Sequence, residues 1–333
     1  MTDETNVSNL PASIAPAIAG IPAALVPASV KALDRLLGAA VDIPVAWLEQ
    51  QKAKIKAKTA SIEAVEGAIG NSVATKIVSD EDVIEAATAA LLRKEYRRTK
   101  NLEAVGVAMI EDMATSGQSG AENAPPPDDV DEDWLNVFER YAESASSERM
   151  QKLWGRVLSG EVRKPGKFSL RTLRFLSEFS QADALTFADF CENCFGDMAP
   201  SKLVRPDGQK DIRHLIYLES AGLIQGASGI GGLSLSINVN SSGNGMIREG
   251  ALGILFQTEP NTKIEFSTVT LTPLGQELVA LLPQRDKVKV AERVAEAIRS
   301  DKIHSCYLYA LPDNGPASPM KVLWQKPAPV VEG

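Results

Sequence analysis

Two cysteines near the middle of this 333-residue chain have a spacing that could do chemistry. Cys191 and Cys194 form a Cys-x-x-Cys pair, which can hold half of a zinc site or act as a redox couple. Zinc takes four ligands, however, and the chain has no second pair of this kind. Both sulfurs also share one helical face with Phe187, Phe190 and Phe195, so we expect core packing, with metal binding and redox chemistry as alternatives. We predict no metal site.

A second group could bind an anion. Five basic residues follow one another closely in the sequence: Arg163, Lys164, Lys167, Arg171 and Arg174. Arg171 and Arg174 lie three residues apart near the start of an expected helix, where a phosphate group would be favoured. The competing interpretation is that the group forms ion pairs with the acidic run 128–133, within the chain or across a subunit interface. These five residues are our candidate binding site, and pairing is the favoured interpretation.

Other catalytic patterns are missing from the sequence. The glycine-rich segment 226–253 has neither a P-loop nor a strand-GxGxxG-helix context, and the chain has no Gly-x-Ser-x-Gly motif. Only two histidines are present. We therefore assign no catalytic residue and no cofactor, and we favour a protein without enzymatic activity.

Hydrophobic periodicity and composition predict the elements that must position these residues. The expected parts are an Ala/Pro leader (1–28), long amphipathic helices (29–114), a linker (115–127), a compact helical domain (128–200) and an α+β tail (201–333). Within the tail, alternation at 233–239, 254–257, 263–271 and 306–311 predicts strands. The expected fold class is mainly α: a helical body with a small C-terminal α+β winged-helix-like unit.

The tail resembles a winged-helix domain in its order of motifs. A leucine-rich helix at 214–224 ends in Ala-Gly, strands follow, and LTPLGQELVALL at 271–282 begins another helix. DNA binding needs several Lys or Arg residues to neutralise phosphates. Between Leu223 and Leu282, however, acidic residues outnumber basic ones. The basic residues are Arg248 and Lys263, and the acidic residues are Glu249, Glu259, Glu265 and Glu277. We therefore expect a structural or protein-binding version of the motif.

Three stretches resemble a known family. They are DEDWL at 131–135, the stretch SSERMQKLWGRVLSGEVRKPGKFSLRTLRFLSEFS at 146–180, and DALTF at 183–187. Together they are similar to a bacterial family known as a domain of unknown function, number 2806. The resemblance implies bacterial origin and a largely helical body, and it brings no established reaction or catalytic residue.

Composition and charge restrict the class of protein. The chain is 44% hydrophobic and 23% charged, as globular proteins are, and its net charge of −8 argues against coating nucleic acid through bulk charge. Three cysteines fit a reducing cytoplasm. Residues 6–30 carry no charge but contain four prolines, which disfavour a membrane-spanning helix. We expect a cytoplasmic protein, with peripheral membrane association as an alternative.

These observations favour a non-enzymatic bacterial interaction or regulatory protein, and the setting of phage or stress defence rests on analogy alone. The expected partner is another protein or a second copy of the chain. One alternative is a membrane-associated effector that uses the N-terminal apolar segment. The other is a nucleic-acid-linked regulator that uses the basic group.

Overall fold

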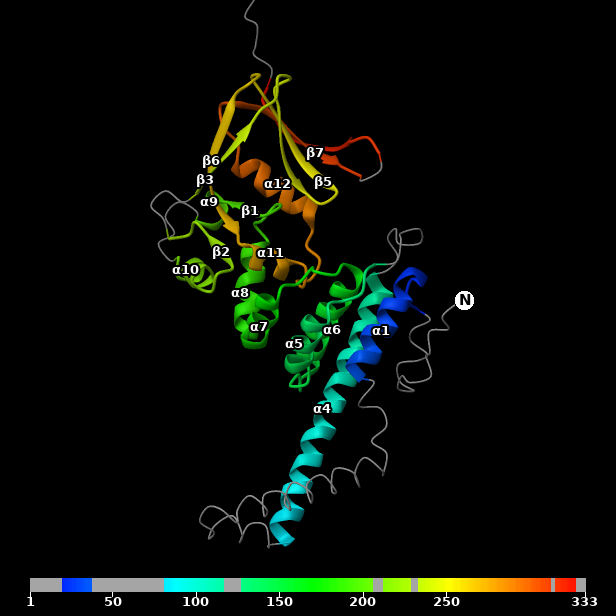
Figure 1. Ribbon diagram of the computed structural model, residues 1–333. Coiled ribbons are helices and arrows are strands. Elements are labelled where there is room, and N and C mark those ends of the chain that lie inside the picture. The colour runs from blue at the N-terminus through cyan, green and yellow to red at the C-terminus, as the bar shows by residue number, and fades with distance from the viewer. Residues whose placement is uncertain are drawn as a thin grey trace, which may run out of the picture. The chain divides into compact units, whose positions relative to one another are not determined.

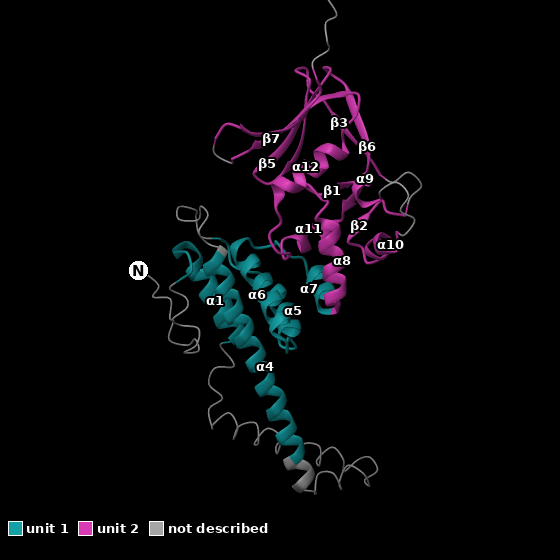
Figure 2. Ribbon diagram, turned by 180° about the vertical axis from the view of Figure 1, so that it is seen from behind, with its two compact units in different colours: residues 1–177 teal, residues 178–333 magenta. Residues whose placement is uncertain are grey.

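The structure is a computed structural model that describes residues 20–37, 81–116, 127–205, 212–228, 233–312 and 315–327. Its backbone contacts divide the chain into two compact units, residues 1–177 and 178–333, which Figure 2 colours separately. The described part of unit 1 is helical, whereas unit 2 combines helices with two β-sheets.

Unit 1 is built from helices, of which Figure 1 labels α1, α4, α5, α6 and α7. They are η3 (Ala23–Leu25), α1 (Val26–Leu37), α4 (Glu81–Ser116), α5 (Glu132–Ala142), α6 (Glu148–Arg163) and α7 (Leu170–Glu178). Side-chain caps fix where two of them begin. The carboxylate of Asp131 accepts a hydrogen bond from Trp134 N at 2.8 Å, and the hydroxyl of Ser147 accepts one from Met150 N at 3.3 Å. Each cap satisfies an N–H group that the first helical turn leaves unpaired.

Helix α6 packs directly on α4, and a glycine allows the close contact. A Cβ atom on Gly155 would lie 2.6 Å from Ala108 Cβ and 2.8 Å from the Ala108 carbonyl carbon. Only hydrogen fits at this position. The buried apolar residues of α4 run from Leu102 to Met113, so its C-terminal half is the part that packs into unit 1.

An aromatic cluster fills the space between α5 and α6. Trp154 is 1% exposed, stacks with Tyr141 at 6.0 Å and meets the edge of Phe138 at 5.5 Å between ring centroids. Phe138 in turn stacks on Trp134 at 5.1 Å. Rings of this size bury enough apolar surface to form the centre of a small domain.

Unit 2 contains short helices and strands. Its helices are α8 (Gln181–Cys191), α9 (Ser201–Val204), α10 (Arg213–Ser220), α11 (Pro273–Val279) and α12 (Lys287–Ala297). Its strands are β1 (Met198–Pro200), β2 (Ile224–Gln225), β3 (Leu233–Asn238), β4 (Asn244–Glu249), β5 (Leu252–Thr258), β6 (Lys263–Leu271), β7 (Ile303–Ala310) and β8 (Ser318–Gln325). In one sheet β1, β2 and β3 all pair antiparallel with β6. The other sheet is antiparallel in the order β4-β5-β7-β8.

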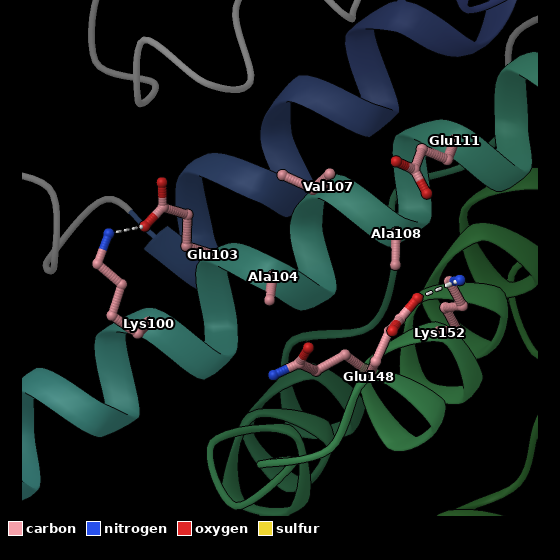
Figure 3. Close-up of a pocket in the computed structure, with 9 residues that line it drawn as sticks. Lys100, Glu103, Ala104, Val107, Ala108, Glu111, Glu148 and Lys152 are labelled. Atoms are coloured by element: carbon pink, nitrogen blue, oxygen red, sulfur yellow. Dashed lines mark hydrogen bonds and ion pairs between the residues drawn. The ribbon is translucent and has the colours of Figure 1, made fainter.

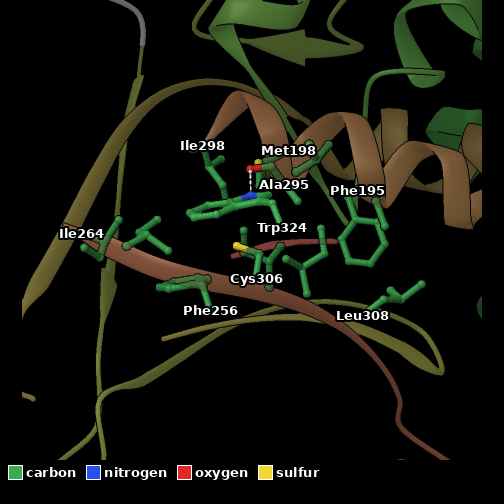
Figure 4. Close-up of a cluster of buried hydrophobic side chains, with 14 of the residues drawn as sticks. Phe195, Met198, Phe256, Ile264, Ala295, Ile298, Cys306, Leu308 and Trp324 are labelled. Atoms are coloured by element: carbon green, nitrogen blue, oxygen red, sulfur yellow. Dashed lines mark hydrogen bonds between the residues drawn. The ribbon is translucent and has the colours of Figure 1, made fainter. Parts of the chain in front are cut away.

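Helix α12 covers the inner face of the second sheet. Its buried residues Val294 and Ala295 belong to one apolar cluster with Phe256, Cys306 and Trp324 from the sheet, as Figure 4 shows. The indole N–H of Trp324 donates to the carbonyl of Ala295 at 2.8 Å. This bond satisfies the polar atom of a large side chain inside an apolar core.

The prediction of a mainly α fold is wrong, because the described residues contain eight strands in two antiparallel sheets and the fold is therefore α+β. Alternation predicts β3, β5, β6 and β7 but not the others. Strand β4 lies in the glycine-rich segment, where Gly245 leaves room for the Phe256 ring; a Cβ there would lie 2.4 Å from a ring carbon. In β8 only Trp324 is buried, so no alternating pattern is present.

Several expectations fall outside the described residues. These are most of the leader 1–28, residues 38–80 of the expected long amphipathic helices and most of the linker 115–127. In α1 the apolar positions Val30, Leu33 and Leu37 are buried, as their spacing predicts. The expected division into five parts stays a prediction, and α4 and α5, which flank the expected linker, both lie in unit 1.

The contact at Gly155 predicts a stability effect. Gly155→Ala should destabilise unit 1 by about 1–3 kcal/mol, because the new methyl group overlaps the α4 backbone and outweighs the better helix propensity of alanine. Urea denaturation followed by circular dichroism measures the change. Arg149→Ala, on the exposed side of the same helix, is the control and should change stability by less than about 0.5 kcal/mol. A fully stable Gly155→Ala variant would contradict the packing described for α4 and α6.

Candidate functional site

The predicted basic group extends from the end of α6 through the following loop into α7. Arg163 is engaged inside unit 1: its guanidinium donates to the Asp112 carboxylate at 3.1 Å and to the Asp112 carbonyl at 3.0 Å. Ser159 donates to the same carboxylate at 2.6 Å. The expected pairing of Arg163 with the run 128–133 is therefore wrong, since its partner is a residue of α4.

The other members of the group have different surroundings. Lys167 is half-buried with its Nζ 5.2 Å from the centre of the Phe168 ring, and burial, followed by the nearby Arg163, lowers the pKa of its ammonium group. Arg174 is exposed, but it already interacts with another residue and is therefore not free to bind an anion. Lys164 and Arg171 are exposed and have no side-chain partner among the residues described. Two of the five side chains are thus available to an external anion.

A buried carboxylate, which sequence reasoning missed, holds the loop that carries this basic group. Glu161 is 1% exposed and accepts hydrogen bonds from Gly166 N at 2.5 Å and Phe168 N at 2.9 Å. The carbonyl of Phe168 accepts from the Trp134 indole N–H at 2.7 Å. The sequence does contain a signal for this role, because Glu161 is an acidic residue next to Val162 on a helix face that is otherwise largely apolar. Its role is to shape the loop.

The Cys-x-x-Cys pair lies in the core, as we expected. Cys191 and Cys194 are both fully buried, and burial raises the pKa of the Cys194 thiol. The guanidinium of Arg285 binds the carbonyls of both cysteines, at 2.9 Å for Cys194, and pairs with Glu249 at 2.9 Å. Both charged side chains are about nine-tenths buried. The turn is therefore fixed through its backbone, while the sulfurs point into the core.

The winged-helix-like motif forms a junction within unit 2. Thr272 caps α11 by accepting from Gly275 N at 3.1 Å, and its hydroxyl donates to Gly222 O at 2.6 Å. A Cβ on Gly275 would lie 2.2 Å from the Leu223 carbonyl oxygen. The glycine is thus required because α11 approaches the backbone after α10. This contact within unit 2 accounts for the threonine and the glycine of the winged-helix-like motif, so their presence does not require a DNA-binding role.

A groove lies between α4 and the first turns of α6, and sequence reasoning did not predict it. Its volume is about 410 Å³, and Figure 3 shows the residues that line it. On α4 they are Lys100, Glu103, Ala104, Val107, Ala108 and Glu111, and on α6 they are Glu148, Gln151 and Lys152. The floor is made of small apolar side chains, because Gly155 brings the helices together one turn further along α6. Ion pairs border it, at 2.8 Å for Lys100 with Glu103 and 2.6 Å for Lys152 with Glu148.

The groove side of α4 continues toward its N-terminus. Arg93, Tyr96 and Arg97 lie seven residues before Lys100, Glu103 and Ala104, so they share the same helix face. Tyr96 is 60% exposed, and both arginines are exposed or half-exposed. We call this face the α4 stripe; it consists of Arg93, Tyr96, Arg97, Lys100, Glu103, Ala104, Val107, Ala108 and Glu111.

The described part of the chain offers neither a metal-binding cluster nor a membrane-spanning helix. Among the described residues, no three His, Cys, Asp or Glu side chains are grouped so that they could hold a metal ion. In the same part of the chain, no helix is both long enough and apolar enough to span a membrane.

Glu161 predicts a second stability effect. Glu161→Ala should destabilise unit 1 by about 2–4 kcal/mol, since two backbone N–H groups lose their acceptor. Thermal and urea denaturation measure the loss. Glu132→Ala, which removes an exposed carboxylate from α5, should have a much smaller effect. Equal effects of the two variants would show that the loop does not depend on Glu161.

The buried thiols predict slow chemical modification. Burial raises the pKa of Cys306 to about 12, so very little thiolate is present near neutral pH. An alkylating reagent at about pH 8 should label the three cysteines at least about a hundredfold more slowly in the folded protein than in urea. Mass spectrometry of labelled peptides measures each site. Rapid labelling of Cys191 and Cys194 would instead favour a redox or metal role.

Comparison with known proteins gives a family match over part of the chain and no activity. No curated protein and no solved structure matches the chain. The matching region begins in α4 and ends in β1, so it contains the groove, the Glu161 loop and the Cys-x-x-Cys turn. The resemblance stated from the sequence is confirmed: residues 91–199 of this chain match the family described as Protein of unknown function (DUF2806).

Proposed function

We propose that the protein is a non-enzymatic interaction protein that pairs with a second copy of itself through the α4 stripe. The observation that carries the proposal is that the N-terminal half of the stripe is exposed, with two arginines and Tyr96, and that the groove beside it has an apolar floor and charged edges. A bacterial cytoplasm, a regulatory role and a setting in phage or stress defence belong to the same proposal.

Charge complementarity favours a second copy as the occupant. The N-terminal half of the stripe is basic, with Arg93 and Arg97. At the groove, Glu111 forms no direct ion pair within the described residues, although its charge attracts Lys152, whose ammonium group is bonded to Glu148; Lys100 is bonded to Glu103. Opposite charges at the two ends of one helix face are satisfied when two copies of that face meet antiparallel.

The shapes of the side chains agree with an antiparallel register in which two copies of α4 cross at the level of Leu102, a buried residue on the side of α4 away from the stripe. In that register Arg93 of each copy lies opposite Glu111 of the other, and Tyr96 lies at the level of Ala108, which is itself buried against Gly155. The exposed ring would then meet the partly exposed part of the groove floor, Ala104 and Val107, as aromatic side chains do when they anchor interfaces. The ring would lose most of its contact with water, and this burial drives association.

Charge reversal at one pair tests the proposal. The full-length protein should sediment as a dimer, and either Arg93→Glu or Glu111→Lys alone should raise the dissociation constant by at least about tenfold, because like charges then face each other twice. An equimolar mixture of the two variants should recover dimers, since both contacts become attractive again. Analytical ultracentrifugation of each variant and of the mixture measures this.

Two controls make the result specific. Arg140→Glu reverses an exposed charge on α5, outside the stripe, and should leave the dimer unchanged. Higher salt should weaken the wild-type dimer, because exposed charges are screened. A monomeric wild-type chain at tens of micromolar, or a mixture that stays monomeric, would overturn the proposal.

A further inference from the structure

Unit 2 contains a cavity that the proposed self-association does not use. It lies beside β1, α9, β6 and the C-terminal end of α12, and its volume is about 440 Å³. This volume is in the range of sites for small organic ligands. The lining residues are Pro200, Ser201, Lys202, Arg205, Ile264, Glu265, Phe266, Ser267, Ala297, Ile298, Arg299 and Ser300.

The cavity carries more positive charge than its surroundings neutralise. Lys202 and Arg205 have no ion-pair partner anywhere in the described part of the chain. Arg299 pairs with Glu296 at 3.2 Å and lies over the Trp324 ring at 4.9 Å. The acidic lining residue, Glu265, is paired with Lys263 at 2.6 Å. Two cationic side chains therefore remain available to an anion.

Two donors in the lining are buried and unsatisfied. Within the described residues, neither the hydroxyl of Ser201 nor the Nε atom of Arg205 has a hydrogen-bond partner, although both atoms are shielded from solvent. A buried polar group without a partner costs free energy that folding does not recover. An acceptor with several oxygens would satisfy both at once.

Another part of the lining is apolar. Ile264 and Ile298 are each 3% exposed, and Phe266 is half-buried on the same strand as Ile264. A ligand that fits these walls carries an apolar or aromatic body as well as its charged group.

We infer that this cavity binds a small organic phosphate. The phosphate lies on Arg205, Lys202 and Ser201, where a doubly negative group matches two unpaired cations and accepts from both buried donors. The organic body lies against Phe266 and Ile298. A carboxylate would neutralise one of the two cations only.

Isothermal titration calorimetry on the full-length protein tests the inference with three probes. Phenyl phosphate supplies the phosphate and an aromatic body, inorganic phosphate supplies the anion alone, and phenol supplies the body alone. Phenyl phosphate should bind more tightly than inorganic phosphate and compete with it, and phenol should not bind. Arg205→Leu should weaken phenyl phosphate binding at least about tenfold, as expected for a lost charge-assisted contact.

Two more variants distinguish a loss of phosphate binding from a loss of folding. Lys202→Gln changes an exposed side chain that the fold does not need, and it should also weaken binding. Lys302→Ala removes an exposed charge close to the cavity but outside its lining, and it should leave binding unchanged. The inference is overturned if neither phosphate binds at millimolar concentration, if phenol binds as well as its phosphate, or if Lys302→Ala weakens binding as much as Lys202→Gln.

Discussion

Unit 1 depends on one steric constraint, the contact of Gly155 with the α4 backbone at Ala108. Because no side chain separates the helices there, α6 buries Trp154 against α5 and aligns Arg163 with Asp112. The same contact leaves an open groove next to it, bordered by side chains of both helices. One glycine thus sets the core, an internal ion pair and the proposed interface.

Several charged side chains of α1, α4 and α5 form ion pairs within unit 1. Arg98 in the basic part of α4 pairs with Glu143 at 2.7 Å and with Glu139, and Lys31 of α1 pairs with Asp129 of the acidic run. Such partly exposed pairs contribute little to stability, but they determine which faces meet. Charges without internal partners, on the α4 stripe and in the unit 2 cavity, are therefore the ones to which we assign external partners.

Unit 2 is organised around a different contact. The buried pair of Arg285 with Glu249 connects the segment before α12, the end of β4 and the turn at Cys191 and Cys194. A buried charge is tolerated only when it is paired and hydrogen-bonded, and Arg285 meets both conditions. Arg205 has a buried donor without a partner among the described residues, so we assign these two arginines of unit 2 different roles: Arg285 supports the fold, and Arg205 binds the proposed phosphate.

The sequence by itself determined the amphipathic helices, the core position of the cysteines and the family resemblance of residues 91–199, because these depend on local spacing and residue type. It did not determine the fold class, since β4 and β8 lack alternation and are strands only through their neighbours. Nor did it predict the groove, the partner of Arg163 or the unit 2 cavity. Each of these brings together residues far apart in the chain, and only tertiary packing decides which distant side chains meet.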